Sequence, residues 1–297
     1  MSKKIVLFGS NGQLGTEIKN QFISKNVISY PKKDLDITNK NMLNESFRNI
    51  YDDIVINASA YTNVDGAEDD FNLAKDVNSN AAGCIAINCE KKHSYLFHYS
   101  TDYVFDGTKK SSYTEEDRTQ PINLYGTSKL IGEQKICEHM SKYYIFRTSW
   151  VYGSYGKNFA KTMVSLMMEK DEIRVVDDQF GVPTSTSMLA EITELFINEI
   201  IDGKPPEYGI YNVVPDGEAS WYDFSVHILN YLKENFPEKC KTKEIQRVTS
   251  NEFKSRAKRP KNSVLSNSKL KLKTKIKLYN WQKYLNIFLE NYFKEEK

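Results

Sequence analysis

The first half of the chain alternates short apolar runs with amphipathic helical patterns, and this alternation constrains the fold more than any other feature. The apolar runs predict strands at residues 4–8, 27–30, 53–57, 95–105 and 143–152. Patterns with helical periodicity lie between them at residues 13–24, 39–50, 71–91 and 124–140. Strands that alternate with helices form right-handed βαβ units around a parallel sheet. The sequence therefore predicts an α/β fold with a Rossmann-type, doubly wound parallel sheet.

After Gly153 the alternation loosens, which indicates a second and smaller unit. Helices are predicted at residues 158–169, 188–201, 221–235 and 281–293, an extended stretch at 173–183 and a strand at 208–214. Residues 269–278 alternate lysine with apolar side chains, a period that favours a strand. We expect a dinucleotide-binding core from residues 1–155, to which about 186–214 return. Residues 156–185 and 215–297 would form a mainly C-terminal α/β substrate-binding domain.

Composition and charge exclude several classes of protein. A chain that is 40% apolar with a net charge of +2 is not typical of disorder, and no apolar stretch approaches the ~18 residues of a membrane span. Four scattered cysteines without a CxxC pair favour reduced thiols in a cytoplasmic protein. The four histidines have no metal-binding spacing, so we predict no metal.

A basic block lies between Lys239 and Lys277, where 14 Lys and Arg face two acidic residues. Such a block fits a solvated face, an anionic small ligand or nucleic acid. We favour the solvated face, then the anionic ligand, because no nucleic-acid-binding motif accompanies the charge.

A glycine-rich loop joins the first predicted strand to the first predicted helix. Its sequence, GSNGQLG, places glycines at Gly9, Gly12 and Gly15. A tight turn that leads into a helix N-terminus can hold a pyrophosphate through free amides and the helix dipole. Because the loop follows the first strand of a βαβ series, we interpret it as a dinucleotide site rather than a simple turn.

Tyr125 and Lys129 lie four residues apart on a predicted helix and share one face. A nearby ammonium favours a tyrosinate, which lets a phenol exchange protons nearer neutral pH. The chain contains a second pair with this spacing, Tyr279 and Lys283, which we expect to have packing and surface roles. The first pair follows a strand that ends in Thr101, whose hydroxyl could polarise a carbonyl.

Together these segments resemble the dTDP-4-dehydrorhamnose reductases of the extended short-chain dehydrogenase/reductase superfamily. The resemblance covers nearly the whole chain, through GSNGQLG (9–15), DLDIT (34–38), NASAYTNVDGAE (57–68), HYSTDYVFDG (98–107), YGTSKLIGE (125–133), FRTSWVYG (146–153), NFAKTM (158–163), DQFGVPTS (178–185) and RPKNSVL (259–265). STDYVFDG combined with RTSWVYG is far more specific than the glycines or the YxxxK spacing.

The resemblance implies residue roles. The family's catalytic residues fall on Thr101, Tyr125 and Lys129. Its cofactor contacts fall on Gly9, Gly12, Gln13, Leu14, Asp36, Ile37, Ala60, Tyr61, Thr62, Tyr99, Tyr125 and Lys129. Its sugar nucleotide would be held by Thr101, Asp102 and Trp150, with Asn158 and Arg259 near the diphosphate.

The implied reaction is the NAD(P)H-dependent reduction of the C4 ketone of dTDP-4-dehydro-L-rhamnose, the last step of dTDP-rhamnose synthesis for cell-surface polysaccharide. Hydride would reach C4 while Tyr125 protonates the oxygen, Thr101 bonds that oxygen, and Lys129 holds the ribose and lowers the pKa of Tyr125. Reduction of another nucleotide-linked 4-keto-6-deoxy sugar and a non-catalytic regulatory subunit remain alternatives. A 4,6-dehydratase is disfavoured, because Tyr103 follows Asp102 where dehydratases carry glutamate.

Two departures from the family shape further expectations. Many relatives carry an aspartate after the second strand, where this chain has Lys32 and Lys33. A cation there can accept the extra phosphate of NADP, so we expect NADPH to be used at least as well as NADH, with Lys32 as a contact. Some members hold Mg²⁺ with glutamates, but only Glu17 is matched here, its partner being replaced near Ser187. We expect no nucleic-acid or membrane partner; a homodimer is one candidate assembly.

Overall fold

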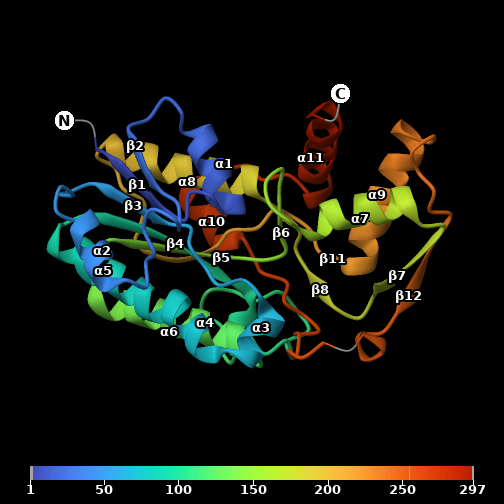
Figure 1. Cartoon of the computed structure of the whole chain (residues 1–297), viewed down its shortest axis with the longest axis horizontal. Helices are drawn as coiled ribbons and strands as arrows, with labels where there is room; N and C mark the ends of the chain where they lie inside the picture. Colours follow the sequence, from blue (N-terminus) through green and yellow to red (C-terminus); the bar gives the residue numbers. More distant parts are fainter. Residues whose placement is uncertain (1–2, 254, 296–297) are drawn as a thin grey trace.

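The computed structural model describes residues 3–253 and 255–295, and its main feature is a six-stranded sheet. The strands are β1 (Ile5–Phe8), β2 (Val27–Tyr30), β3 (Ile54–Asn57), β4 (Tyr95–Thr101), β5 (Tyr143–Thr148) and β10 (Gly209–Asn212). Their order is β10-β5-β4-β3-β1-β2, and every neighbouring pair is parallel (Figure 1). The strand order reverses between β1 and β3, the switch point at which open α/β sheets bind ligands.

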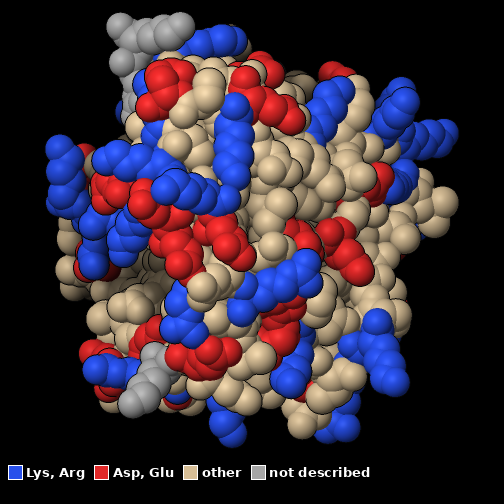
Figure 2. Space-filling model, turned by 90° about the vertical axis from the view of Figure 1, so that its right-hand side faces the viewer, with Lys and Arg blue, Asp and Glu red and all other residues tan. Residues whose placement is uncertain are grey.

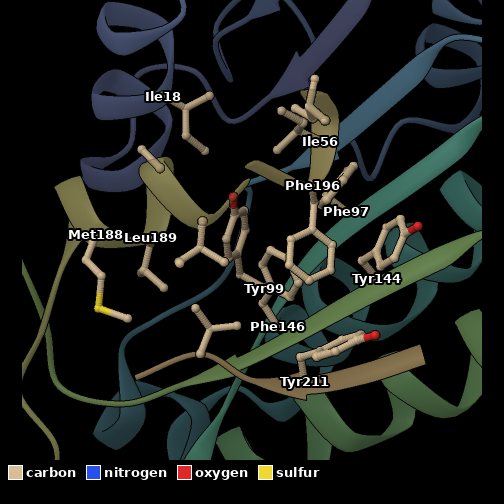
Figure 3. Packing of buried hydrophobic residues seen from close by; sticks show 14 of the residues in the cluster. Ile18, Ile56, Phe97, Tyr99, Tyr144, Phe146, Met188, Leu189, Phe196 and Tyr211 are labelled. Atoms are coloured by element: carbon tan, nitrogen blue, oxygen red, sulfur yellow. The ribbon is translucent and has the colours of Figure 1, made fainter. Parts of the chain in front are cut away.

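Helices cover both faces of this sheet, as the sequence predicts. Ile5 and Leu7 point to the face covered by α1 (Gln13–Gln21) and α8 (Thr186–Ile201). Figure 3 shows this core, in which Phe196 of α8 packs among Phe97, Tyr144, Phe146 and Tyr211 of the strands. Val6 and Phe8 point to the other face. The helices there are α2 (Lys40–Ser46), α5 (Ala81–Lys91) and α6 (Leu124–His139). The doubly wound α/β fold is confirmed.

A second hydrophobic core lies outside this sheet. It joins α7 (Phe159–Glu169), α9 (Trp221–Asn235) and α11 (Trp281–Glu295) to the parallel pair β7 (Glu172–Val176) and β12 (Glu244–Val248). We call these elements the C-terminal unit; Figure 1 shows most of them on the right. Two-residue strands lie where the chain passes toward it: β6 (Val151–Tyr152), β8 (Phe180–Gly181), β9 (Thr184–Ser185) and β11 (Ala219–Ser220).

Short elements complete the described chain. They are α3 (Val64–Asp69), α4 (Phe71–Lys75), a π-helical turn (Asp76–Asn80), two 3₁₀ turns (Asp102–Val104 and Ser250–Glu252) and α10 (Ser268–Thr274). In Figure 2 the basic side chains are interspersed with acidic ones, and ion pairs such as Arg174–Glu252 link them. Within residues 3–253 and 255–295, no helix is both long and apolar enough to span a bilayer.

Two local predictions are wrong. Residues 268–274 form helix α10 rather than a strand. Leu270 is buried while Leu272 is 76% exposed, so the alternating leucines lie on opposite sides of a helix instead of one face of a strand. The strand predicted at residues 143–152 breaks at Trp150, whose φ of 47° lies in the left-handed region.

Candidate active site

The glycine-rich loop is built for close approach of backbone to a ligand. Gly9 has a φ of 76°, and Gly15 lies so near the loop that a Cβ on it would be 2.1 Å from the Gly9 carbonyl oxygen. Gly12 caps helix α1, whose first turn contains no acidic residue and receives no hydrogen bond from a capping side chain. Free amides at the helix N-terminus and the helix dipole suit a pyrophosphate.

A cavity of about 540 Å³ opens from this loop across the carboxyl ends of the strands. This volume lies in the range of small-molecule and cofactor sites. The cavity brings together twelve predicted site residues: Gly12, Gln13, Leu14, Ala60, Thr62, Tyr99, Thr101, Asp102, Tyr125, Lys129, Trp150 and Arg259. They come from the sheet, from α6 and from the loop before Pro260, which are far apart in the sequence.

Six predicted site residues do not line this cavity: Gly9, Lys32, Asp36, Ile37, Tyr61 and Asn158. The Asp36 carboxylate accepts hydrogen bonds from the amide and hydroxyl of Thr38, which lower its pKa. Lys32 is exposed. The Asn158 side chain caps α7 and donates to Gln13 Oε1 at 2.8 Å, so it reaches the cavity only through Gln13.

Helix α6 carries Tyr125 because its first turn is fixed to neighbouring segments. Asn123 accepts a hydrogen bond from the Gly126 amide, and Glu68 of α3 accepts one from the Leu124 amide. A Cβ on Gly126 would lie 2.2 Å from the Tyr103 carbonyl oxygen, so the helix packs tightly on the segment after β4. These contacts place the Tyr125 ring in the cavity wall.

Burial raises the pKa of Tyr125 to about 12, although a hydrogen bond with Thr101 acts in the opposite direction. The pKa of Tyr125 is therefore raised overall in the protein alone, because desolvation of the phenolate dominates. The phenol stays protonated near neutral pH, which is the form that a proton donor needs.

Lys129 is 1% exposed, one helical turn beyond Tyr125. Its Nζ donates to the Tyr99 carbonyl oxygen at 2.5 Å and lies 3.4 Å from His98 Nε2. Burial lowers the pKa of Lys129 to about 8, and the Glu133 carboxylate opposes that shift. The Tyr99 hydroxyl contacts Thr193 Oγ1 at 2.7 Å, inside the core that Figure 3 shows.

A buried ion pair stands behind these residues and is absent from the sequence-based prediction. Arg147 Nη2 of β5 lies 2.7 Å from Glu133 Oε2, and Ser100 donates to Glu133 Oε1 at 2.5 Å. Both charged side chains are at most 3% exposed. The pair ties α6 to the ends of β4 and β5. The YGTSKLIGE and FRTSWVYG segments contain both residues, but the sequence does not show that they meet.

Thr101 and Asp102 lie at the end of β4 and face the cavity. Thr101 Oγ1 donates to Asp102 Oδ1 at 3.0 Å, while Asp102 Oδ2 is buried without a hydrogen-bond partner in the protein. Burial raises the pKa of Asp102 to about 7. Asp102 is only 3% exposed, although it lines the cavity.

Two indoles form the opposite side of the cavity. Trp150 and Trp221 stack with ring centroids 3.6 Å apart and planes at 8°. Gly181 leaves room for them, since a Cβ there would lie 2.5 Å from Trp150 Cε2. Nearby, Arg259 forms an ion pair with Asp65 at 3.1 Å. The sequence-based prediction did not include Trp221, which aromatic content alone does not distinguish from core tryptophans.

Another cavity, of about 390 Å³, contains Glu17, Ser187 and Glu191. Burial raises the pKa of Glu191, and the negative charges of Glu17 and Glu194 raise it further. Across the described part of the chain, no cluster of three or more His, Cys, Asp or Glu side chains could hold a metal ion.

Comparison with protein families and known proteins gives one consistent result. The family described as "RmlD substrate binding domain" matches residues 3–294. The chain is 36% identical to the dTDP-4-dehydrorhamnose reductase of Escherichia coli K12, and the alignment covers 94% of both proteins.

Solved structures agree. A dTDP-4-dehydrorhamnose reductase from Bacillus anthracis, determined in complex with NADP, superposes with a TM-score of 0.89 at 36% identity and covers 98% of this chain and all of that one. A Clostridium acetobutylicum dTDP-4-dehydrorhamnose reductase gives a TM-score of 0.88 at 39% identity, with 97% of this chain and 98% of that chain covered.

Proposed function

The chain belongs to the dTDP-4-dehydrorhamnose reductase family, and from that premise we propose how its cavity reduces dTDP-4-dehydro-L-rhamnose to dTDP-L-rhamnose. The enzyme is an NAD(P)H-dependent oxidoreductase of dTDP-rhamnose synthesis. The observation that carries the proposal is the convergence of Thr101, Tyr125 and Lys129 on the cavity that begins at the glycine-rich loop.

The loop fits a dinucleotide. The first turn of α1 offers free amides to the pyrophosphate, whereas the Gly12 amide is used inside the loop, where it donates to the Gly9 carbonyl oxygen. A Cβ on Gly15 would fill the space that the tight turn needs. Ala60 and Thr62 line the cavity beyond β3. When bound, the reduced nicotinamide supplies hydride to the C4 carbonyl carbon. We assign Asp36 and Ile37 to the adenine side of the same site, outside the cavity itself.

Tyr125 donates its phenolic proton to the C4 oxygen as negative charge develops there. Its raised pKa keeps that proton in place until the oxygen becomes basic enough to take it. Thr101 turns its hydroxyl proton from Asp102 to the same oxygen and so donates a hydrogen bond to the growing charge. Lys129 binds the ribose hydroxyls and, in its ammonium form, stabilises the tyrosinate that proton donation leaves.

Asp102 and Trp150 hold the sugar, and Arg259 binds the diphosphate. The Asp102 side chain, which lines the cavity, accepts a sugar hydroxyl. The Arg259 guanidinium pairs with the partly exposed Asp65 and also interacts with the Tyr103 hydroxyl, and a diphosphate can replace the ion pair with Asp65. Asn158 supports this side by orienting Gln13.

The assignment of domains follows from this division of roles. Residues 1–155 and about 186–214 hold the cofactor and the catalytic groups, while 156–185 and 215–297 hold most of the sugar nucleotide. We also propose a homodimer and a cytoplasmic location; the four unpaired cysteines fit a reducing compartment.

The test is a reduction assay with dTDP-4-dehydro-L-rhamnose and NADPH or NADH, with identification of the product sugar. We expect stoichiometric cofactor oxidation and dTDP-L-rhamnose as product. Turnover only with a different 4-keto-6-deoxy sugar nucleotide would change the substrate. Nucleotide binding without turnover would favour a regulatory subunit.

A further inference from the structure

A chain of buried polar groups reaches Lys129 from strand β3. The Ser59 amide donates to Asn57 Oδ1 at 3.1 Å, and Asn57 Nδ2 lies 3.1 Å from His98 Nδ1. His98 Nε2 then lies 3.4 Å from Lys129 Nζ. Asn57, His98 and Lys129 are each 1% exposed, so little of their surface reaches water.

The direction of the first link fixes the tautomer of His98. Because Asn57 Oδ1 accepts from the Ser59 amide, the Asn57 amide must present its Nδ2 hydrogens to the histidine. His98 Nδ1 is therefore an acceptor. Burial lowers the pKa of His98 well below its ordinary value, so the ring is neutral. A neutral ring that accepts at Nδ1 carries its proton on Nε2.

This tautomer places an N–H group opposite Lys129. An ammonium has only donors, so it would face the Nε2 proton with another proton, whereas a neutral amine offers a lone pair to it. One remaining N–H of Lys129 still binds the Tyr99 carbonyl oxygen. We propose that Asn57 and His98 are positioning residues that hold the Lys129 amine against Tyr99 and favour its neutral form in the cofactor-free enzyme.

Other charged groups near Lys129 act in both directions. Glu133, four residues further along α6, favours the ammonium, but its carboxylate is shared with Arg147 of β5 and Ser100 of β4. Tyr125 lies one turn back on α6, and Asp102 faces the same cavity from the end of β4. The pair on β3 and β4 thus opposes Glu133 and keeps the Lys129 proton exchangeable near working pH.

The consequence for catalysis rests on the proposed function. If Lys129 must be an ammonium to stabilise the tyrosinate, kcat/KM falls as pH rises through the pKa of Lys129 in the free enzyme. Asn57 and His98 then set the position of this alkaline limb, although neither touches substrate.

The first experiment needs no variant and no turnover. Nitrogen-15 NMR of the histidine-labelled wild-type protein distinguishes the two neutral tautomers, and the chain has only four histidines to assign. We expect a neutral His98 with its proton on Nε2 at pH 7. A proton on Nδ1, or a charged ring, would overturn the proposal.

The second experiment removes the hydrogen bond that fixes the tautomer of His98. Asn57→Leu removes the amide that holds His98, so Nε2 can turn its lone pair to the ammonium. We expect the His98 proton to move to Nδ1 and the alkaline limb of kcat/KM to move up by about one pH unit. A changed tautomer with an unmoved limb would show that His98 does not govern Lys129.

Asn212→Leu is the matched control. Asn212 is also a buried amide, but it binds the carbonyl oxygens of Tyr113 and Ser266. It should lower stability and leave the limb in place; a shift equal to that of Asn57→Leu would refute the proposal. If wild-type enzyme does not turn over the dTDP sugar, only the proposed function is refuted. The His98 tautomer and the pH dependence of NADPH binding still test the proposed role of Asn57 and His98.

Discussion

Helix α6 and the segment that leads into α11 contain the same YxxxK spacing in opposite surroundings: Tyr279 precedes α11, and Lys283 lies in its first turn. Lys129 is 1% exposed and bonded to the backbone of β4, whereas Tyr279 is 44% exposed and Lys283 Nζ lies 3.2 Å from its ring centroid. Tyr125 and Lys129 have shifted pKa values because protein replaces water around them. Burial and fixed partners, rather than spacing, distinguish the pair that we propose for proton transfer from the second pair.

The largest expected effect comes from removing the phenolic hydroxyl of each tyrosine in turn, which tests whether the two pairs differ in function. Tyr125→Phe should reduce kcat by roughly 10²–10⁴, the range for loss of a general acid, while cofactor binding persists. Tyr279→Phe should leave kcat within experimental error. Steady-state kinetics of both variants decide the matter, and equal losses would mean that the two pairs have been assigned the wrong roles.

The ion pair behind α6 has an exposed counterpart between Arg174 and Glu252. Arg147→Met leaves Glu133 buried without its cation and should lower the free energy of unfolding by about 3–5 kcal/mol. Arg174→Met breaks a pair whose side chains are about half exposed and should cost about 0–1 kcal/mol. Urea unfolding measures both; similar losses would contradict the contrast drawn from burial.

Two aspartates near β4 should respond to pH with opposite sign. Burial raises the folded-state pKa of Asp102 to about 7, so its stabilisation is present at low pH and is lost as pH rises toward 7. Asp102→Asn should therefore stabilise the protein relative to wild type more at pH 8 than at pH 5, which a higher Tm reports. The free energy of unfolding should change by roughly 1.4 kcal/mol for each unit by which the pKa of Asp102 is raised.

Asp106 is the control for this pH effect, because hydrogen bonds from Thr108 lower its pKa. Its contribution is present above its unfolded pKa and is lost as pH falls, so Asp106→Asn should cost more stability at pH 7 than at pH 3. A Tm difference for Asp102→Asn that does not vary with pH would show that Asp102 is solvated.

Two arginines of one loop allow the same contrast between a cavity residue and an exposed residue to be tested at the substrate side. Arg259 lines the cavity and pairs with Asp65, whereas Arg256 pairs with Asp69 and is mostly exposed. Arg259→Ala should raise KM for the sugar nucleotide by roughly 10- to 100-fold, the loss of a charge-assisted contact, with little change in KM for the reduced cofactor. Arg256→Ala should change neither, and the reverse KM pattern for Arg259 would move it out of the substrate site.

The smallest expected effect concerns two neighbouring lysines after β2. We expect wild-type enzyme to use NADPH at least as well as NADH. Lys32→Asp should shift the ratio of kcat/KM values toward NADH by up to ~1–2 kcal/mol if Lys32 binds the extra phosphate. Lys33→Asp serves as the control for charge alone. A wild-type preference for NADH that Lys32→Asp leaves unmoved would make Lys32 an ordinary exposed lysine.

The sheet could be predicted because its signals are local. Each strand of the first half is a short apolar run, and each helix face recurs at helical spacing. The helix at Ser268–Thr274 was not predicted, because its leucines alternate with lysines as in a strand. Only tertiary packing shows that Leu270 is buried and Leu272 is exposed.

In the site, motif residues could be placed by resemblance, since their segments are contiguous. Contacts between segments could not: the pairing of Glu133 with Arg147 depends on how α6 packs on β5, and that of Asn57 with His98 depends on the register of β3 and β4. Asn158 shows the converse: its segment matches, yet its side chain is used to cap a helix.

The stacked indoles in the cavity wall also give the protein an intrinsic spectroscopic probe. The chain has three tryptophans, and two of them lie face to face, one from the end of the sheet and one from the C-terminal unit. Parallel chromophores at 3.6 Å couple their electronic transitions, which gives a near-ultraviolet circular dichroism band sensitive to their relative angle. A ligand that changes the angle between Trp150 and Trp221 therefore changes this band, and such a change can be followed by stopped flow without a label.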